Sequence, residues 1–333
     1  MTDLAISAEH VRDAASQIRG AAVRTPLLEN MALNARIGRR VLIKFEGAQH
    51  TGSFKFRGAY NRLSRIPVAE RAAGVVAWSS GNHAQGVAAA ARILGIPATI
   101  VMPADAPKIK MENTSALGAQ IIAYDRLTQS REEIATALSK ERGAVLVPSF
   151  DDPHIIAGQG TVGLEILEQA KEVGAEIGQI VCCCGGGGLI AGLATAVKDA
   201  APHIAIYSAE PAAFDDTARS LASGTREVVP AGAKSICDAL LAPSPGEMTF
   251  PINKALLAGG LSVTDDEVRA AMRYAFETLK LVAEPGGSVA LAALLHGKVP
   301  DSDAPIVIVI SGANVDPADY AAILGAAPAP VSA

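Results

Sequence analysis

A single lysine, Lys55, stands among apolar, small and hydroxyl side chains in the segment 51–59, which reads TGSFKFRGA. Burial in such surroundings and the nearby cation of Arg57 both favour the neutral form of the amine. A neutral amine is the form that attacks a carbonyl group to make a Schiff base. Taken alone, the same pattern also fits a solvated lysine at the start of a helix.

A run of four glycines follows the apolar segment 179–184. The run consists of Gly185, Gly186, Gly187 and Gly188, and Leu189 opens the helical pattern that comes next. Glycines allow successive backbone amides to turn toward one centre, and the start of a helix adds a partial positive charge. The pattern predicts a phosphate-binding loop, with a plain flexible turn as the alternative. It lacks the lysine of a nucleotide-binding P-loop and the distant acid of a dinucleotide fingerprint.

Two more polar loops follow apolar segments. Residues 79–83 read Ser-Ser-Gly-Asn-His and offer hydroxyls, an amide and backbone donors at the start of a helical pattern. Such a loop suits a carboxylate, and an ordinary helix N-cap is the alternative. Ser311 follows the apolar segment 306–310. Its hydroxyl is expected in the crevice at the end of that strand.

The elements that must position these loops alternate along the chain. Short apolar segments predict strands at 41–45, 74–78, 98–102, 120–124, 144–147, 179–184, 204–210 and 306–310. Helical patterns occupy 84–94, 108–117, 128–142, 189–200, 265–279 and 288–295. This alternation predicts an α/β fold with two open parallel sheets, which bind ligands outside the carboxyl ends of their strands.

Composition narrows the classes of function. The 333 residues are 50% hydrophobic and carry a formal net charge of -5 without a basic block, which argues against a nucleic-acid partner. No apolar run approaches the roughly twenty residues of a membrane span, and the first residues lack a signal pattern, so a cytoplasmic protein is expected. Cys182, Cys183, Cys184 and Cys237 follow neither disulfide nor zinc spacing, and we interpret them as buried small hydrophobic residues.

Together these segments closely resemble the fold-type II pyridoxal phosphate enzymes, the family of threonine dehydratase, serine racemase, cysteine synthase and the tryptophan synthase β subunit. The resemblance extends from Thr25 to Ser311, and the segments 53–59 and 79–83 look like the dehydratase and racemase branch. It implies an architecture like that of the tryptophan synthase β subunit. The expected parts are a large cofactor-binding domain (1–49 and 147–324), a small mobile domain (50–146) and a flexible tail (325–333).

The resemblance also implies a role for each site residue. Lys55 would hold pyridoxal phosphate as a Schiff base and act as the base for the substrate's α-proton. The cofactor would contact Phe54 with its ring, Asn82 with its phenolate oxygen, Ser311 with its pyridine nitrogen and residues Gly185 to Leu189 with its phosphate. Ser79, Ser80, Asn82 and His83 would bind the substrate, and Ser80 would face it opposite Lys55 as a second catalytic residue.

The implied reaction eliminates water from a small L-β-hydroxy amino acid to give a 2-oxo acid and ammonia. Threonine, serine and 3-hydroxyaspartate all qualify, because no contact for a second substrate carboxylate can be located in the sequence. A racemase of serine or aspartate is the alternative within this branch, and a non-enzymatic module that senses a phosphorylated metabolite is the alternative of another class. A homodimer is the expected assembly.

An acidic turn follows the segment 204–210. In the racemase-like branch the matching positions bind a divalent cation, so the resemblance implies Glu210, the carbonyl of Phe214 and Asp216 as ligands of magnesium, calcium or manganese. A solvated turn in which Asp215 or Asp216 caps the next helix is the alternative.

Overall fold

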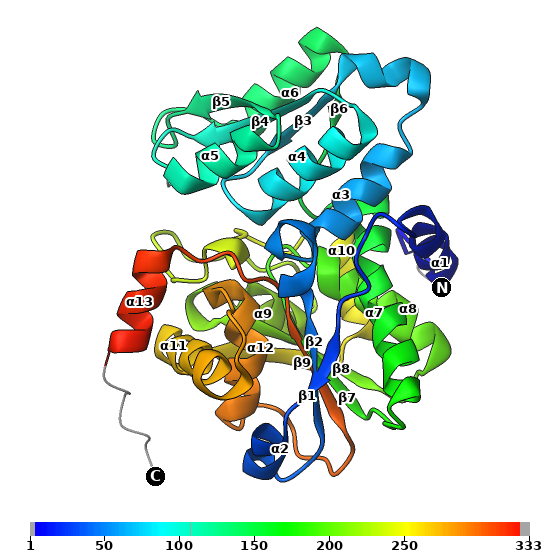
Figure 1. The fold of residues 1–333 in the computed structure, drawn as a ribbon, viewed down its shortest axis with the longest axis vertical. Coiled ribbons are helices and arrows are strands. Elements are labelled where there is room, and N and C mark those ends of the chain that lie inside the picture. The colour runs from blue at the N-terminus through cyan, green and yellow to red at the C-terminus, as the bar shows by residue number, and fades with distance from the viewer. Residues whose placement is uncertain (1–3, 107, 327–333) are drawn as a thin grey trace.

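The computed structural model describes residues 4–106 and 108–326, in which the strands form two sheets. The larger sheet has the order β1 (Leu27–Glu29), β2 (Val41–Phe45), β10 (Ile306–Ile310), β7 (Gln179–Cys183), β8 (Ala205–Pro211) and β9 (Gly259–Val263). The smaller sheet has the order β5 (Gln120–Tyr124), β4 (Ala98–Pro103), β3 (Val75–Trp78) and β6 (Val145–Leu146). Figure 1 shows the smaller sheet in an upper lobe and the larger sheet below it.

Helices surround both sheets. The small lobe consists of β3–β6 with α4 (Asn82–Leu94), α5 (Lys108–Ala116) and α6 (Arg131–Arg142), and α3 (Lys55–Ser64) lies between α4 and the large lobe (Figure 1). The large lobe contains α1 (Ala8–Gln17), α2 (Met31–Ile37), α7 (Pro153–Glu172), α8 (Gly188–Ala200), α9 (Asp216–Ser223), α10 (Thr249–Leu256), α11 (Asp265–Tyr274), α12 (Pro285–Leu295) and α13 (Pro317–Gly325). Of the predicted tail, residues 327–333 lie outside the described part of the chain.

Parallel pairing predominates in both sheets, as the alternation of strands and helices predicts. The exception is β1, which pairs with β2 in antiparallel register, Leu27 opposite Lys44. The chain returns from β1 to β2 through only the short helix α2, whereas a parallel neighbour requires a longer crossover. The fold class is therefore as predicted, α/β with open parallel sheets, with one antiparallel strand added at the edge.

The central strands are buried because helices cover both faces of the larger sheet. All five side chains of β10, Ile-Val-Ile-Val-Ile, are buried, as a parallel strand covered on both faces requires. β2, β5 and β10 begin and end at the predicted residues. β1, β9, α1, α2, α3, α7, α9, α10 and α13 were not predicted.

Among the described residues, no helix is both long enough and apolar enough to cross a membrane.

Candidate active site

A cavity of about 560 Å³ lies where the two lobes meet. Its wall includes every residue that the sequence predicts for cofactor or substrate binding: Phe54, Lys55, Ser79, Ser80, Asn82, His83, Gly185, Gly186, Gly187, Gly188, Leu189 and Ser311. The loops after β3, β7 and β10 reach it from the carboxyl ends of their strands, where open α/β sheets bind ligands. The volume lies within the usual range of small-molecule pockets.

Lys55 is the first residue of α3, and its position is fixed from two sides. The preceding loop is bound to the loop after β10, because the Phe54 amide donates to the Ser311 carbonyl (3.1 Å) and the Ala313 amide donates to the Gly52 carbonyl (2.9 Å). The Lys55 amine donates to the Ser149 carbonyl at 2.9 Å. Burial lowers the pKa of this amine to about 8. A substantial fraction of it is therefore neutral at physiological pH and able to act as a nucleophile or a base.

The glycine loop, residues 185–188, lies at the N-terminus of α8. Gly187 has a φ of 91°, in the left-handed region that favours glycine. A Cβ atom at Gly186 would lie 2.4 Å from the ring of Phe150, and one at Gly187 would lie 2.6 Å from the amide nitrogen of Asn253. A side chain would therefore clash at Gly186 and Gly187, and the helix N-terminus behind the loop favours an anion such as a phosphate.

The loop 79–83 lines the same cavity and lies at the N-terminus of α4. Its last residue, His83, is buried, and burial followed by the charge of Lys55 lowers the pKa of its ring to about 3. The Nε2 atom lies 2.9 Å from the Val147 carbonyl, so Nε2 carries the proton of the neutral ring. Nδ1 is buried without a hydrogen-bond partner among the described residues. This tautomer leaves Nδ1 as a buried acceptor, while Ser79, Ser80 and the backbone amides offer the donors that a carboxylate needs.

Sequence reasoning missed Glu284, which is 2% exposed and lines the same cavity. Its Oε1 accepts a hydrogen bond from Asn82 Nδ2 at 2.6 Å. Asn314 Nδ2 donates to Asn82 Oδ1 (2.8 Å) and to the carbonyl of Thr51 (2.7 Å). These contacts fix which way the Asn82 amide points. Burial, followed by the charge of Asp238, raises the pKa of Glu284 to about 8.

Sequence reasoning also missed the charged residues at the edge of the cavity. They are Lys110, Arg126 and Arg131 of the small lobe and Asp238 of the large lobe. Lys110 and Asp238 form an ion pair between the lobes. No periodicity or motif distinguishes these residues from other surface charges, so the sequence carries no signal that would have found them.

The predicted cation ligands lie outside this cavity. Glu210 and Asp216 are both buried. The carboxylate of Glu210 accepts from the amides of Thr217 (3.1 Å) and Ala218 (2.8 Å), whereas Asp216 Oδ2 is buried without a partner among the described residues. Burial is the main cause that raises the pKa of both groups, to about 8 for Glu210 and about 7 for Asp216. No group of three or more histidine, cysteine or acidic side chains suited to a metal occurs among the described residues.

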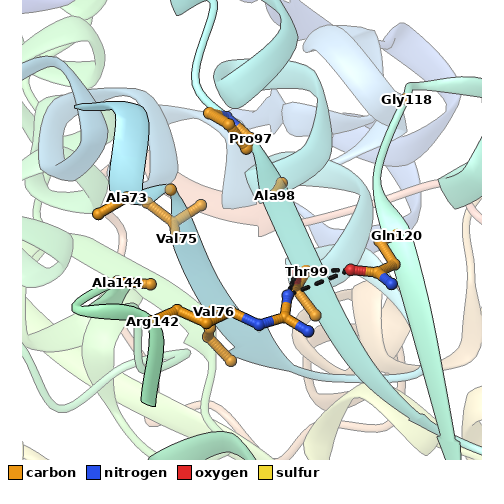
Figure 2. Close-up of a pocket in the computed structure, with 11 residues that line it drawn as sticks. Ala73, Val75, Val76, Pro97, Ala98, Thr99, Gly118, Gln120, Arg142 and Ala144 are labelled. Carbon is orange, nitrogen blue, oxygen red and sulfur yellow. Dashed lines mark hydrogen bonds between the residues drawn. The ribbon is translucent and has the colours of Figure 1, made fainter. Parts of the chain in front are cut away.

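Two further features are the four cysteines and a second, smaller cavity. The four cysteines are buried free thiols, as expected, although Cys183 and Cys184 also line the cavity. A second cavity of about 210 Å³, shown in Figure 2, lies at the amino ends of the small sheet. There Arg142 donates to Thr99 Oγ1 (3.0 Å) and Gln120 Oε1 (3.2 Å). The polar groups at this end therefore bond one another.

Comparison with known proteins identifies the family of this chain. The family model described as "Pyridoxal-phosphate dependent enzyme" matches residues 18–312. An L-threo-3-hydroxyaspartate ammonia-lyase of a Pseudomonas species is 42% identical over 93% of this chain and 96% of its own. An L-threonine ammonia-lyase of Thermotoga maritima is 40% identical over 93% of this chain and 76% of its own. The structure of maize serine racemase superposes with a TM-score of 0.90 at 37% identity, over 96% of each chain. The chain therefore belongs to the family of pyridoxal-phosphate dependent enzymes.

Proposed function

We propose that this protein is an ammonia-lyase that removes water from a small L-β-hydroxy amino acid, after which water hydrolyses the dehydrated product to a 2-oxo acid and ammonia. The observation that carries the proposal is the position of the Lys55 amine, whose pKa is lowered to about 8, in one cavity with the glycine loop and the loop 79–83. The ammonia-lyase names of two relatives at about 40% identity support the same reaction. Its candidate substrates are threonine, serine and 3-hydroxyaspartate.

The residues of the cavity fit the cofactor of the family. Lys55 would hold pyridoxal phosphate covalently, and the glycine loop with Leu189 would hold its phosphate, where side chains larger than glycine would clash. Phe54 would lie against the ring, and Ser311 and Asn82 would face its nitrogen and its phenolate oxygen. When bound, pyridoxal phosphate supplies an electron-withdrawing ring that acidifies the Cα–H bond of an attached amino acid.

The chain's own groups supply the remaining chemistry. Ser79, Ser80 and the N-terminus of α4 would hold the substrate carboxylate. The neutral Lys55 amine would take the α-proton, and the resulting ammonium would give a proton to the departing β-hydroxyl, which leaves as water. A pKa near 8 suits both steps at neutral pH. Movement of the small lobe toward the large lobe would exclude bulk water.

A screen of β-hydroxy amino acids for ammonia and 2-oxo acid release tests the function. We expect turnover by the parent enzyme. Lys55→Ala should lose covalent cofactor attachment and all but a trace of turnover, because the attachment point and the base disappear together. Lys108→Ala, which changes a 90% exposed lysine outside the cavity, is the control and should remain active. Substantial elimination by Lys55→Ala would contradict the assignment.

Serine racemisation is the second candidate, since Ser80 lines the cavity and maize serine racemase has the same fold. A racemase needs a proton donor on the face of the substrate opposite Lys55, and Ser80 is the residue proposed there. The two reactions differ in product. If L-serine yields D-serine faster than pyruvate, racemisation replaces elimination as the principal function.

We also propose a divalent cation at Glu210, the Phe214 carbonyl and Asp216. Two buried carboxyl groups with raised pKa values, one of them with an oxygen atom that has no described partner, favour a positive charge between them. Chelator should lower the activity and the melting temperature of the parent, and magnesium or calcium should restore both. Glu210→Ala combined with Asp216→Ala should make the protein insensitive to chelator. If chelator changes neither the activity nor the melting temperature of the parent, the protein has no such site.

Two further proposals concern the assembly and the domain boundaries of the protein. We expect a cytoplasmic homodimer that acts on a small amino acid, without nucleic-acid or membrane partners. The domains would be 1–49 with 147–324, and 50–146, with residues from both in the walls of the cavity.

A further inference from the structure

Three cations line the part of the cavity that belongs to the small lobe, and the proposed reaction uses none of them. Lys110 comes from α5, Arg126 from the connection after β5, and Arg131 from the start of α6. The large lobe contributes two carboxyl groups, Asp238 and Glu284. Asp238 is paired with Lys110, and the raised pKa of about 8 leaves most of Glu284 uncharged at neutral pH. The two arginines therefore supply positive charge that no carboxyl group lining the cavity balances.

Both arginines can exchange their present partners at little cost. Arg126 pairs with Asp105 (2.7 Å) and Arg131 with Glu132 (2.9 Å), and neither acid lines the cavity. The side chains of Arg126 and Arg131 are 53% and 45% exposed. Ion pairs with this much solvent contribute little to stability, so a carboxylate that arrives in the cavity competes with them readily.

The other anionic groups of the reaction already have positions elsewhere. The phosphate belongs to the glycine loop at the start of α8, and the substrate's α-carboxylate belongs to the loop 79–83 at the start of α4. Neither group requires an arginine. Arginine presents a planar fork that matches a carboxylate with two parallel hydrogen bonds. The arginines can thus bind a second carboxylate on the substrate's side chain.

We propose that Arg126 and Arg131 bind a second carboxylate of the substrate, so that the preferred substrate class is the dicarboxylic β-hydroxy amino acids, represented by 3-hydroxyaspartate, rather than threonine or serine. This inference rests on the proposed ammonia-lyase function and selects among its three candidate substrates. The methyl group of threonine and the hydrogen of serine offer the arginines nothing to bind. The enzyme would therefore prefer hydroxyaspartate because the arginines bind its second carboxylate, and not because the cavity excludes threonine or serine by size.

Turnover of the three substrates tests the proposal. The parent holoenzyme should have a kcat/KM for L-threo-3-hydroxyaspartate at least about tenfold above those for L-threonine and L-serine, the effect of one charge-assisted contact. Arg126→Gln and Arg131→Gln should each reduce the hydroxyaspartate value about tenfold, chiefly through KM, and should change the threonine value less than about threefold. Arg12→Gln is the matched control, since Arg12 is 56% exposed, is paired with Asp199 and lies outside the cavity. It should leave the ratio unchanged.

Binding of unreactive acids provides a readout without turnover. By calorimetry, the holoenzyme should bind succinate at least about tenfold more tightly than butyrate, which lacks the second carboxylate. The Arg126→Gln, Arg131→Gln double variant should lose this difference, and Arg12→Gln should keep it. The inference is overturned if the double variant keeps the parent's ratio of succinate affinity to butyrate affinity. It is also overturned if the arginine variants keep the parent's ratio of kcat/KM for hydroxyaspartate to kcat/KM for threonine. If threonine and serine release ammonia in that case, the proposed function stands without it. If no β-hydroxy amino acid is turned over, the proposed function fails.

Discussion

Glu284 is an acid with no cationic partner in hydrogen-bond contact among the described residues. Its only described side-chain hydrogen bond comes from the Asn82 amide, which is itself held by Asn314. A neutral carboxyl group satisfies this contact without the cost of a buried charge. Glu284 is thus suited to hold Asn82, the residue proposed to face the phenolate oxygen, while adding little negative charge to the cavity near pH 7.

The pH dependence of stability tests the state of Glu284. The folded-state pKa of about 8 lies above the ordinary value of 4.5, so this group's contribution to stability is fully present below pH 4.5 and is lost as the pH rises through 8. Glu284→Gln retains the acceptor for Asn82 but cannot ionise. In thermal unfolding of the holoenzyme, the free energy of unfolding of the variant should rise relative to that of the parent between pH 5.5 and 8.5. The rise should be about 1 kcal/mol per pH unit.

The control for that experiment is Glu247→Gln, which removes a glutamate whose side chain is 80% exposed. If the two variants differ from the parent by the same amount at every pH, Glu284 is not uncharged in the folded protein.

How far a residue could be predicted depended on where its partners lie in the chain. Lys55 and the glycine loop each stand in a local pattern that suggests chemistry, whereas the role of Ser311 came from the family resemblance, and all of them line the cavity. Glu284 meets Asn82 across 202 positions of sequence, and Asp238 meets Lys110 across 128. Nothing close to these residues in sequence indicates the contact, because only the packing of the two lobes creates it.

Helices and strands, like single residues, were predicted where the local sequence is distinctive and missed where tertiary packing decides. The strands β2, β5 and β10 combine apolar side chains with clear boundaries, and their limits were predicted to the residue. The longest helix, α7, was missed because it contains glycines, which disfavour an isolated helix. In the fold these glycines allow close contact, since a Cβ atom at Gly158 would lie 2.7 Å from the Cα atom of Gly58, and one at Gly160 would lie 2.7 Å from the Gly192 carbonyl oxygen. Tertiary packing explains both the helix and its composition.

The strands β9 and β1 were also missed for physical reasons. β9 begins with two glycines, Gly259 and Gly260, and glycine is depleted in strands. A Cβ atom at Gly260 would lie 2.6 Å from the backbone of Ala218, so the residue serves the packing of α9 on the sheet. β1 has three residues, too few for any alternation to be visible. Periodicity therefore misses strands that are very short or rich in glycine, whereas β5, an edge strand of ordinary composition, was predicted to the residue.

At the scale of the whole molecule, four charged side chains form a largely buried group that includes Arg57 of α3. Arg57, two positions after Lys55, bonds Glu46 (2.8 Å) and Glu165 of α7 (2.6 Å). Lys44 of β2 also bonds Glu165 at 2.6 Å. The side chains of Lys44, Glu46 and Arg57 are fully buried, and two positive charges balance two negative ones. The group joins α3, which bears Lys55, to the large lobe.

Because these charges are buried, the loss of one should cost far more than the loss of a surface pair. Arg57→Met leaves Glu46 without a cation in a site with no exposure, and we expect it to lower the free energy of unfolding by about 3–5 kcal/mol. Arg12→Met, which breaks the half-exposed pair with Asp199, should cost less than about 1 kcal/mol. Denaturant unfolding followed by circular dichroism measures both. Adding Glu46→Gln to Arg57→Met should recover part of the loss, because it removes the uncompensated charge. Equal stability losses for Arg57→Met and Arg12→Met would show that this buried group does not hold α3 to the large lobe.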